Sequence, residues 1–153
     1  MGVLLSATDS LNWLSNITSV TPAKLTEPIK GSLAPPSRVM FLPYLSGERT
    51  PHNDPAVSGN FSGLGNDNDL KDLTCAIMEG VAFGFGDGYE ALNKTGVRLN
   101  SAMAIGGGAK SNYWLKLIAT VLGKTLDVPE YGEFGAALGA AFLGMLAQTD
   151  HYL

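Results

Sequence analysis

The stretch Met103-Ala104-Ile105-Gly106-Gly107-Gly108-Ala109-Lys110-Ser111-Asn112-Tyr113-Trp114 decides the fold of this chain. The residues from Leu99 to Ile105 are mostly apolar and few, which is typical of a short buried strand. The three glycines that follow carry no side chain, so another molecule can approach the backbone closely. Ser111 is a good N-cap for a helix over residues 113–122, and the N-terminus of a helix presents free N–H groups. The stretch therefore predicts a strand, a glycine turn and a helix.

Two roles are open for the glycine turn on these residues alone. It could form part of a nucleotide site, or it could be a turn that packs a helix against a sheet. It is not a Walker A loop, because no Gly-Lys pair stands before Ser111, and it does not fit the pattern G-x-G-x-x-G. Other motifs have to decide between the two roles.

The composition limits the classes of protein to which the chain can belong. Its 153 residues suffice for one domain with a hydrophobic core, and 45% hydrophobic and 16% charged residues are typical of a globular protein. A net charge of -4 and the lack of a basic run give no indication of a nucleic-acid partner. The N-terminal residues do not resemble a secretory signal. The longest uncharged apolar run, from Phe134 to Leu146, is too short to span a membrane and predicts a buried helix.

Side chains that bind metals well are few. Cys75 is the only cysteine, so no internal disulfide can form, and its apolar helical surroundings predict an inert core residue. His52 and His151 are the only histidines, which speaks against a histidine-based metal cluster. The sequence therefore predicts no metal site, and the single thiol is compatible with a reducing cytoplasm.

Helices and strands alternate along the chain. The pattern predicts helices over residues 3–16, 69–93, 113–122 and 134–147, and strands over residues 38–45, 57–64, 99–105 and 125–128. Residues 19–36 are rich in serine, threonine and proline and predict a loop. This order favours an α/β layer fold with parallel strands.

Small residues recur at intervals of four in the two longest predicted helices. They are Gly80, Gly84 and Gly88 in the first helix, and Gly135, Ala136, Gly139, Ala140 and Gly144 in the last. A glycine in a helix interior costs about 1 kcal/mol relative to alanine. The spacing therefore predicts that another backbone lies close to these faces, either that of the other helix or that of the sheet.

A polar loop over residues 46–55 contains Glu48, Arg49, His52 and Asp54. Such a cluster could be catalytic. A reactive site needs a defined pocket, however, so the pattern favours a solvated loop in which Arg49 pairs with a carboxylate.

Four segments, in this order, resemble the FGGY family of carbohydrate kinases. Phe41 to Pro55 is similar to the corresponding segment of the xylulokinase branch of the family. Gly59 to Glu79 matches a conserved pattern of the family at every defined position. The glycine turn from Gly106 to Trp114 and the segment from Gly132 to Ala141 complete the set. The resemblance covers nearly the whole chain and favours the nucleotide role of the glycine turn.

The resemblance implies an α/β fold of the actin-like ATPase, ribonuclease-H-like type. Residues 1–153 would form a single domain, most of the C-terminal nucleotide-binding domain of such a kinase. The family transfers the γ-phosphoryl group of ATP to a sugar hydroxyl with Mg²⁺, and the xylulokinase branch converts D-xylulose to D-xylulose 5-phosphate. The adenosine site, which holds ATP or ADP, would consist of Gly106, Gly107, Gly108, Ala109, Lys110 and Asn112.

The chain departs from the family pattern in what it lacks. The sugar-binding N-terminal domain, the general-base aspartate and the Gly-Thr-Ser-Gly type phosphate loop are expected upstream of the segment seen here. We therefore expect a fragment that is inactive alone, with no catalytic residue and no metal ligand to assign. The missing strands would leave a sheet edge open, which predicts self-association. A cytoplasmic location without a membrane partner is also implied.

Three alternatives remain open at this point. The parent enzyme could be another FGGY kinase, of the gluconate, ribulose or glycerol type. The chain could be a non-catalytic nucleotide-binding or interaction module. It could also be an actin-like ATPase that never used a sugar, although the match from Gly59 to Glu79 argues against this.

Overall fold

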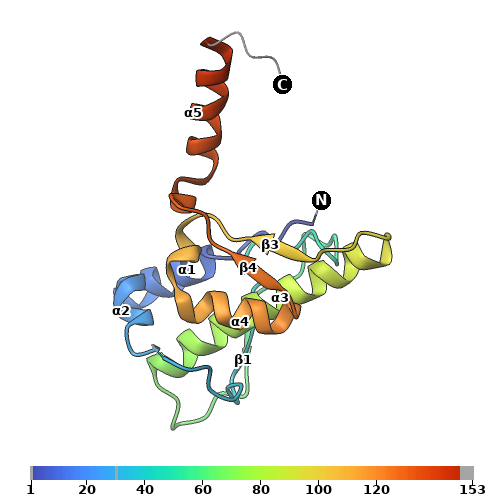
Figure 1. Ribbon diagram of the computed structural model, residues 1–153. Coiled ribbons are helices and arrows are strands. Elements are labelled where there is room, and N and C mark those ends of the chain that lie inside the picture. The colour runs from blue at the N-terminus through green and yellow to red at the C-terminus, as the bar shows by residue number, and fades with distance from the viewer. Residues whose placement is uncertain (1, 30, 149–153) are drawn as a thin grey trace.

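The computed structural model of the protein describes residues 2–29 and 31–148 (Figure 1). The α-helices are α1 (Asp9–Thr18), α2 (Pro22–Thr26), α3 (Leu70–Lys94), α4 (Asn112–Leu122) and α5 (Gly135–Gln148). The strands are β1 (Met40–Leu42), β2 (Asn60–Ser62), β3 (Ser101–Met103) and β4 (Thr125–Asp127). Two 3-10 helices, η1 (Gly107–Lys110) and η2 (Gly132–Phe134), precede α4 and α5.

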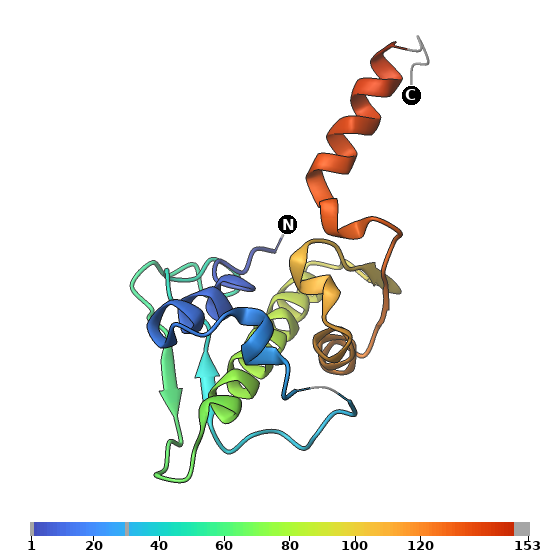
Figure 2. The same cartoon turned by 90° about the vertical axis from the view of Figure 1, so that its left-hand side faces the viewer.

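Helix α3 lies at the centre of the fold, between the β1–β2 pair and α4 (Figure 2). It also packs against α1 and α2. The core around it consists of Leu11, Leu14, Leu25, Ile29, Val39, Phe41, Ala76, Ile77, Met78, Val81, Tyr113 and Trp114. Every other element of the core therefore takes its position from α3.

A capping box determines where α3 begins. The carboxylate of Asp69 accepts hydrogen bonds from the backbone N–H groups of Lys71 and Asp72, at 2.8 and 3.0 Å. The carboxylate of Asp72 accepts one in return from the N–H of Asp69, at 3.1 Å. Free N–H groups of the first turn are thus satisfied. The prediction of a long helix over residues 69–93 is confirmed.

The strands form two separate pairs. Strands β3 and β4 run parallel, with Ser101 opposite Thr125, as expected for strands joined by a helix. Strands β1 and β2 run antiparallel, with Phe41 opposite Phe61, so the prediction of parallel strands is wrong for this pair. No helix stands between β1 and β2 to return the chain to the same end of the sheet, and strands joined directly in this way pair antiparallel.

Two predictions of burial are wrong. The strand predicted over residues 99–105 is shorter, and one of its faces is open, with Met103 67% and Ile105 57% exposed. Helix α5 has no buried residue among those described, extends away from the other elements (Figure 1) and packs against η2. Hydropathy predicts that a segment prefers apolar surroundings, but it does not predict which surface supplies them. Over the described residues, no helix combines the length and the hydropathy that crossing a membrane requires.

Two boundaries near the N-terminus also differ from the prediction. The helix predicted over residues 3–16 begins later, at Asp9, and ends at Thr18. The segment predicted as a loop contains α2, whose N-cap Thr21 accepts a hydrogen bond from the N–H of Lys24 at 3.4 Å. Pro22 follows at the first helical position, where its missing N–H costs nothing.

The predicted close approach to glycine is confirmed at one position of α3. A Cβ atom built on Gly80 would lie 2.1 Å from the carbonyl oxygen of Phe41 in β1. At Gly84 the nearest atom is a side-chain carbon of Leu4, at 3.1 Å, and at Gly88 no heavy atom outside the helix lies within 4 Å. Among the described residues α3 and α5 do not contact each other, so the sheet and not the last helix is the partner.

Two glycine-to-alanine variants test this contact. Gly80→Ala is expected to lower the free energy of unfolding by about 1–3 kcal/mol, because β1 must move away from α3. The control, Gly88→Ala, has room for its methyl group and is expected to raise the free energy of unfolding by up to about 1 kcal/mol. Urea denaturation of both variants measures the difference. A Gly80→Ala variant as stable as the parent would contradict the close contact.

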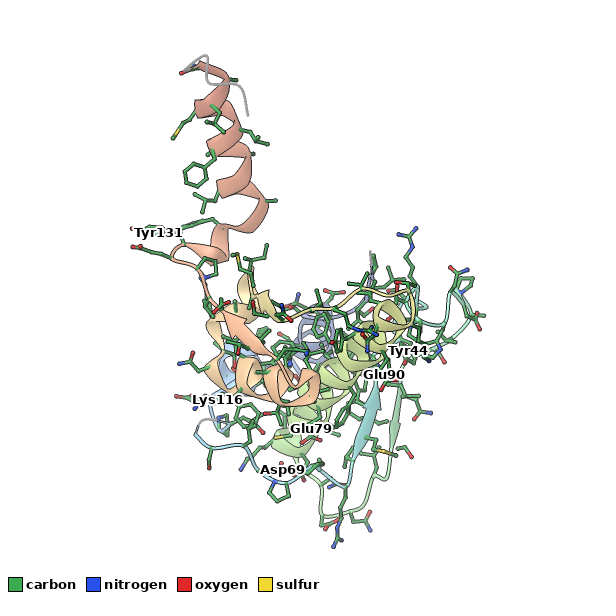
Figure 3. All side chains as sticks on the ribbon, turned by 45° about the vertical axis from the view of Figure 1, so that its right-hand side comes forward. Tyr44, Asp69, Glu79, Glu90, Lys116 and Tyr131 are labelled. Carbon is green, nitrogen blue, oxygen red and sulfur yellow. The ribbon has the colours of Figure 1, made fainter. Side chains whose placement is uncertain are left out.

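Glu79 joins α3 to the segment before β1. Its two carboxylate oxygens accept the N–H of Ser37, at 3.2 and 3.1 Å, and the residue is buried in the interior of α3, where Figure 3 labels it. Burial raises the pKa of Glu79, and the hydrogen bond from Ser37 lowers it by less. The folded protein therefore holds the proton of Glu79 to a higher pH than the unfolded chain does.

The raised pKa has a consequence for stability. As the pH rises from the ordinary pKa of a glutamate, about 4.3, through the raised pKa of Glu79 in the folded protein, the unfolded chain loses this proton before the folded protein does, so ionisation of Glu79 opposes folding. Glu79→Gln retains the size of the side chain and an acceptor for Ser37 but cannot ionise. We expect its free energy of unfolding to rise relative to that of the parent over this range, as measured by denaturation at several pH values. A difference between variant and parent that is independent of pH would contradict this assignment.

Candidate functional site

The glycine turn separates two hollows of the protein surface. The larger hollow has a volume of about 690 Å³ and lies between the turn, α1, α2 and the start of α4. The smaller hollow, of about 370 Å³, lies on the other side of the turn, against α3, α4 and β3. The turn is thus a shared wall, and its two faces meet different surroundings.

Backbone hydrogen bonds hold the turn. Gly106 has a φ angle of +86°, a conformation that favours glycine, and its N–H donates to the carbonyl oxygen of Gly132 at 2.9 Å. The N–H of Ala109 donates to Gly106, and that of Ser111 donates to Gly108. A Cβ atom on Gly107 would meet no heavy atom within 4 Å. A side chain at this position would therefore occupy open space beside the turn.

The start of α4 is held in place from two sides. Ser111 caps the helix, since its hydroxyl oxygen accepts the N–H of Trp114 at 3.3 Å, which confirms the predicted N-cap. The indole N–H of Trp114 donates to the carbonyl oxygen of Met78 in α3 at 3.0 Å, inside the core. Asn112, the first residue of α4, is exposed at the rim of the larger hollow.

The lining of the larger hollow combines an apolar floor with a polar rim. The buried side chains of Leu11, Ile29, Tyr113 and Trp114 contribute to the lining. The polar lining residues are Thr8, Asn12, Thr26, Lys110, Ser111, Asn112 and Lys116. Ligand sites commonly pair an apolar surface with a few polar groups that fix orientation. A flat aromatic base can lie on such a floor, while amides and hydroxyls reach its polar edges.

The predicted site residues divide between the two hollows. Gly107, Gly108, Lys110 and Asn112 line the larger hollow. Gly106 and Ala109 line the smaller hollow, to which Gly107 and Gly108 also contribute. The turn thus directs four of the six predicted residues toward the space next to α1 and α2.

The α1–α2 wall of the larger hollow was missed by the sequence analysis. It contributes Thr8, Leu11, Asn12, Pro22, Ala23 and Thr26. The pair Thr21-Pro22 is a signal for the start of a helix and could have revealed α2. Nothing comparable indicated that α1 would face the glycine turn.

The polar loop over residues 46–55 lines neither hollow at the glycine turn. Glu48 is buried, and one of its carboxylate oxygens accepts the N–H groups of Leu5 at 3.2 Å and of Arg49 at 2.7 Å. Arg49 is exposed and forms no ion pair with the residues that the structure describes, so the predicted pair is wrong. His52 lies 2.9 Å from the hydroxyl of Tyr44. The loop therefore ties residues 3–5 to the fold and is not part of the candidate site.

The described residues offer no metal site. They contain no group of three or more His, Cys, Asp or Glu side chains that could hold an ion, and His151 lies outside them. Cys75 is half-buried and lies outside both hollows at the glycine turn, and burial raises the pKa of its thiol. A thiol with a raised pKa is a weak nucleophile at neutral pH. Neither metal nor thiol chemistry is supported at the glycine turn.

Comparisons with known proteins identify the family of the chain. Residues 3–148 match the model of the FGGY family of carbohydrate kinases, C-terminal domain. The xylulose kinase of Escherichia coli (strain K12) is 40% identical over 151 residues, which cover 96% of this chain and 31% of that protein. The xylulose kinase of Klebsiella pneumoniae is 38% identical over 154 residues and is also covered to 31%.

A solved structure shows the same fold. The crystal structure of a "xyloylose kinase" from Brucella ovis superposes with a TM-score of 0.89 and 49% sequence identity, covering 99% of this chain and 31% of that one. The fold is therefore the actin-like ATPase fold of these kinases, represented by part of its C-terminal domain. Since the family model matches almost every described residue, the chain belongs to the FGGY family of carbohydrate kinases.

Proposed function

We propose that this chain is the nucleotide-binding part of a sugar kinase and that the larger hollow holds the adenosine portion of ATP or ADP. Gly106, Gly107, Gly108, Ala109, Lys110 and Asn112 form the glycine-turn side of this site. The chain would form one domain over residues 1–153.

The observation that carries the proposal is the position of the glycine turn. Two glycines and the exposed amide of Asn112 face a hollow whose floor is apolar and whose opposite wall carries Asn12 and Thr26. A purine ring needs an apolar surface on its face and hydrogen-bonding groups at its edge. The hollow offers both, and the open space beside Gly107 leaves room for the sugar of the nucleoside.

Calorimetric titration with ADP tests the proposed site. Asn112→Ala removes one hydrogen-bonding amide and is expected to weaken ADP binding about tenfold. Gly107→Val places a branched side chain beside the turn and is expected to abolish binding, because it fills space that the ligand needs. The matched control, Asn100→Ala, changes an exposed amide that lines neither of these hollows and is expected to leave binding unchanged.

Melting temperatures of the same variants separate lost binding from lost folding. Both site variants are expected to melt within a few degrees of the parent, because residues 107 and 112 are exposed and a Cβ atom at residue 107 meets no heavy atom within 4 Å. ADP binding that persists unchanged in both folded variants would show that the hollow is not the adenosine site.

We propose further that the complete enzyme transfers the γ-phosphoryl group of ATP to D-xylulose, giving D-xylulose 5-phosphate in the cytoplasm. The chain spans about a third of the length of the xylulose kinases it matches, 31% in each of the two curated relatives. The identities of 40% and 38% to those relatives support D-xylulose over gluconate, ribulose or glycerol.

The described lining of the larger hollow contains no carboxylate and does not fit a Mg²⁺ site, so the metal of the kinase reaction would need other ligands.

A chimeric enzyme tests this activity. Residues 3–148 replace the matching segment of the Escherichia coli xylulose kinase, and transfer from ATP to D-xylulose, gluconate, ribulose and glycerol is measured. We expect phosphorylation of D-xylulose, and in the Asn112→Ala chimera a KM for ATP raised about tenfold with little change in the KM for the sugar. A folded chimera that binds ADP but phosphorylates none of the four acceptors would favour a non-catalytic nucleotide-binding module.

Self-association is proposed on separate grounds. Strand β3 pairs with β4 along one edge, and among the described residues nothing pairs with its other edge. An unpaired strand edge carries free N–H and C=O groups that can bind a second strand. A second copy of the chain could supply that strand.

A further inference from the structure

We propose that the smaller hollow is a second ligand site, which takes a small, uncharged aromatic molecule. Such a molecule would contact the glycine turn on the face that is turned away from the proposed nucleotide. Binding of the aromatic molecule does not depend on the proposed function. Its effect on ADP rests on that function.

The smaller hollow lies in a layer of the fold that the side chains leave unfilled. Among the helices and strands described, β3 packs only against β4, and the hollow separates β3 from α3 and α4. Ala102 lies on the side of β3 opposite to the exposed Met103 and contributes only a methyl group to this layer. Protein interiors are otherwise close-packed, with few voids larger than a water molecule. A volume of about 370 Å³ is therefore space that a ligand can occupy.

The lining of the smaller hollow is apolar and carries no charge. Phe85 and Trp114 supply rings, and Met103 supplies a thioether, which makes favourable contacts with aromatic rings. The described lining contains no Asp, Glu, Lys, Arg or His. Its polar side-chain groups are the hydroxyl of Thr8 and the indole N–H of Trp114, and Met78 already accepts the latter at 3.0 Å. An anion would lose hydration there without gaining a partner, so the hollow favours an uncharged aromatic ligand.

The size and the opening of the hollow suit a molecule of two fused rings. An apolar cavity of about 150 Å³ binds benzene, and the volume of this hollow, about 370 Å³, is more than twice as large. Phe85 is 38% and Met103 67% exposed, so the lining reaches the protein surface and a ligand can enter from solvent. Indole is uncharged, has two fused rings and is therefore a suitable probe.

A ligand in the smaller hollow would act on the glycine turn. Gly107, Gly108 and Trp114 line both hollows, so a molecule in either hollow contacts the same wall. A ligand packed behind this wall is expected to restrict its motion, and a second ligand on the other face then loses less freedom on binding. By linkage, each ligand changes the affinity of the other by the same factor.

Calorimetric titration of the whole chain with indole tests the site. Ala102→Leu fills the hollow and is expected to weaken indole binding about tenfold or more, with a melting temperature equal to or above that of the parent. Phe85→Leu keeps an apolar side chain but removes a ring, and a loss of about threefold is expected. The control, Ala56→Leu, places the same side chain on an exposed loop residue that lines neither hollow, and is expected to bind indole as the parent does.

Amide NMR spectra of the parent show where each ligand binds. Of the two hollows, Gly106 and Ala109 line only the smaller, and Lys110 and Asn112 line only the larger. Indole is expected to shift the amide signals of the first two residues, and ADP those of the other two. Indole-3-acetate, which adds a carboxylate to the probe, is expected to leave the signals of Gly106 and Ala109 unchanged. Saturating indole is expected to lower the Kd of ADP about twofold to threefold.

The possible failures are distinguishable from one another. Indole binding that is absent in the parent, or equal in the parent and in folded Ala102→Leu and Phe85→Leu variants, would overturn the site. If Ala102→Leu does not fold, Phe85→Leu decides. Indole that binds without changing the Kd of ADP would overturn the effect on the nucleotide and support the site. A parent that binds indole but not ADP would overturn the proposed function and support the second ligand site.

Discussion

The approach of β1 to α3 at Gly80 is the contact on which the rest of the structure depends. The carbonyl oxygen of Phe41 occupies the space that a side chain at this position would fill. With β1 at this distance, the ring of Phe41 packs against Phe61, with centroids 4.6 Å apart, and against Trp13, at 6.1 Å. These rings connect the strand pair and α1 to the same core. Because Gly80 has no methyl group, β1 can lie this close to α3. The position of β1 in turn fixes how the strand pair and α1 pack on α3.

The same helix orients the candidate site from another direction. Met78, two residues before Gly80, offers its carbonyl oxygen to the indole of Trp114, and a buried indole N–H without an acceptor would be costly. This bond limits the rotation of α4 about α3, and Asn112 stands at the start of α4. Helices α1 and α2 also pack on α3 and supply the opposite wall of the larger hollow. The hollow thus results from three helices docked on a fourth and not from the glycine turn alone.

The features that the sequence predicted are those with local signals. The start of helix α3 lies within one residue of the prediction, at a capping box of Asp69 and Asp72 that spans one turn, and Ser111 caps the start of α4 with a similarly local hydrogen bond. The direction of the β1–β2 pair and the exposure of α5 depend on contacts between distant residues, which no local pattern contains. The site residues were predicted through family motifs, and the wall that includes Asn12 was missed because its place follows from how α1 docks.

The polar loop and the larger hollow show why ionisable residues in a sequence are a poor guide to chemistry. Glu48 lies in a cluster of charged residues, yet it is buried and accepts backbone N–H groups, which is a structural role. The described lining of the larger hollow has glycine backbone, amides, hydroxyls and two ammonium groups, and no carboxylate. Such groups can bind and orient a nucleotide, but none of them is suited to take the proton from a sugar hydroxyl at neutral pH. Phosphoryl transfer depends mostly on positioning and on neutralising charge, and these are the contributions that this lining can make.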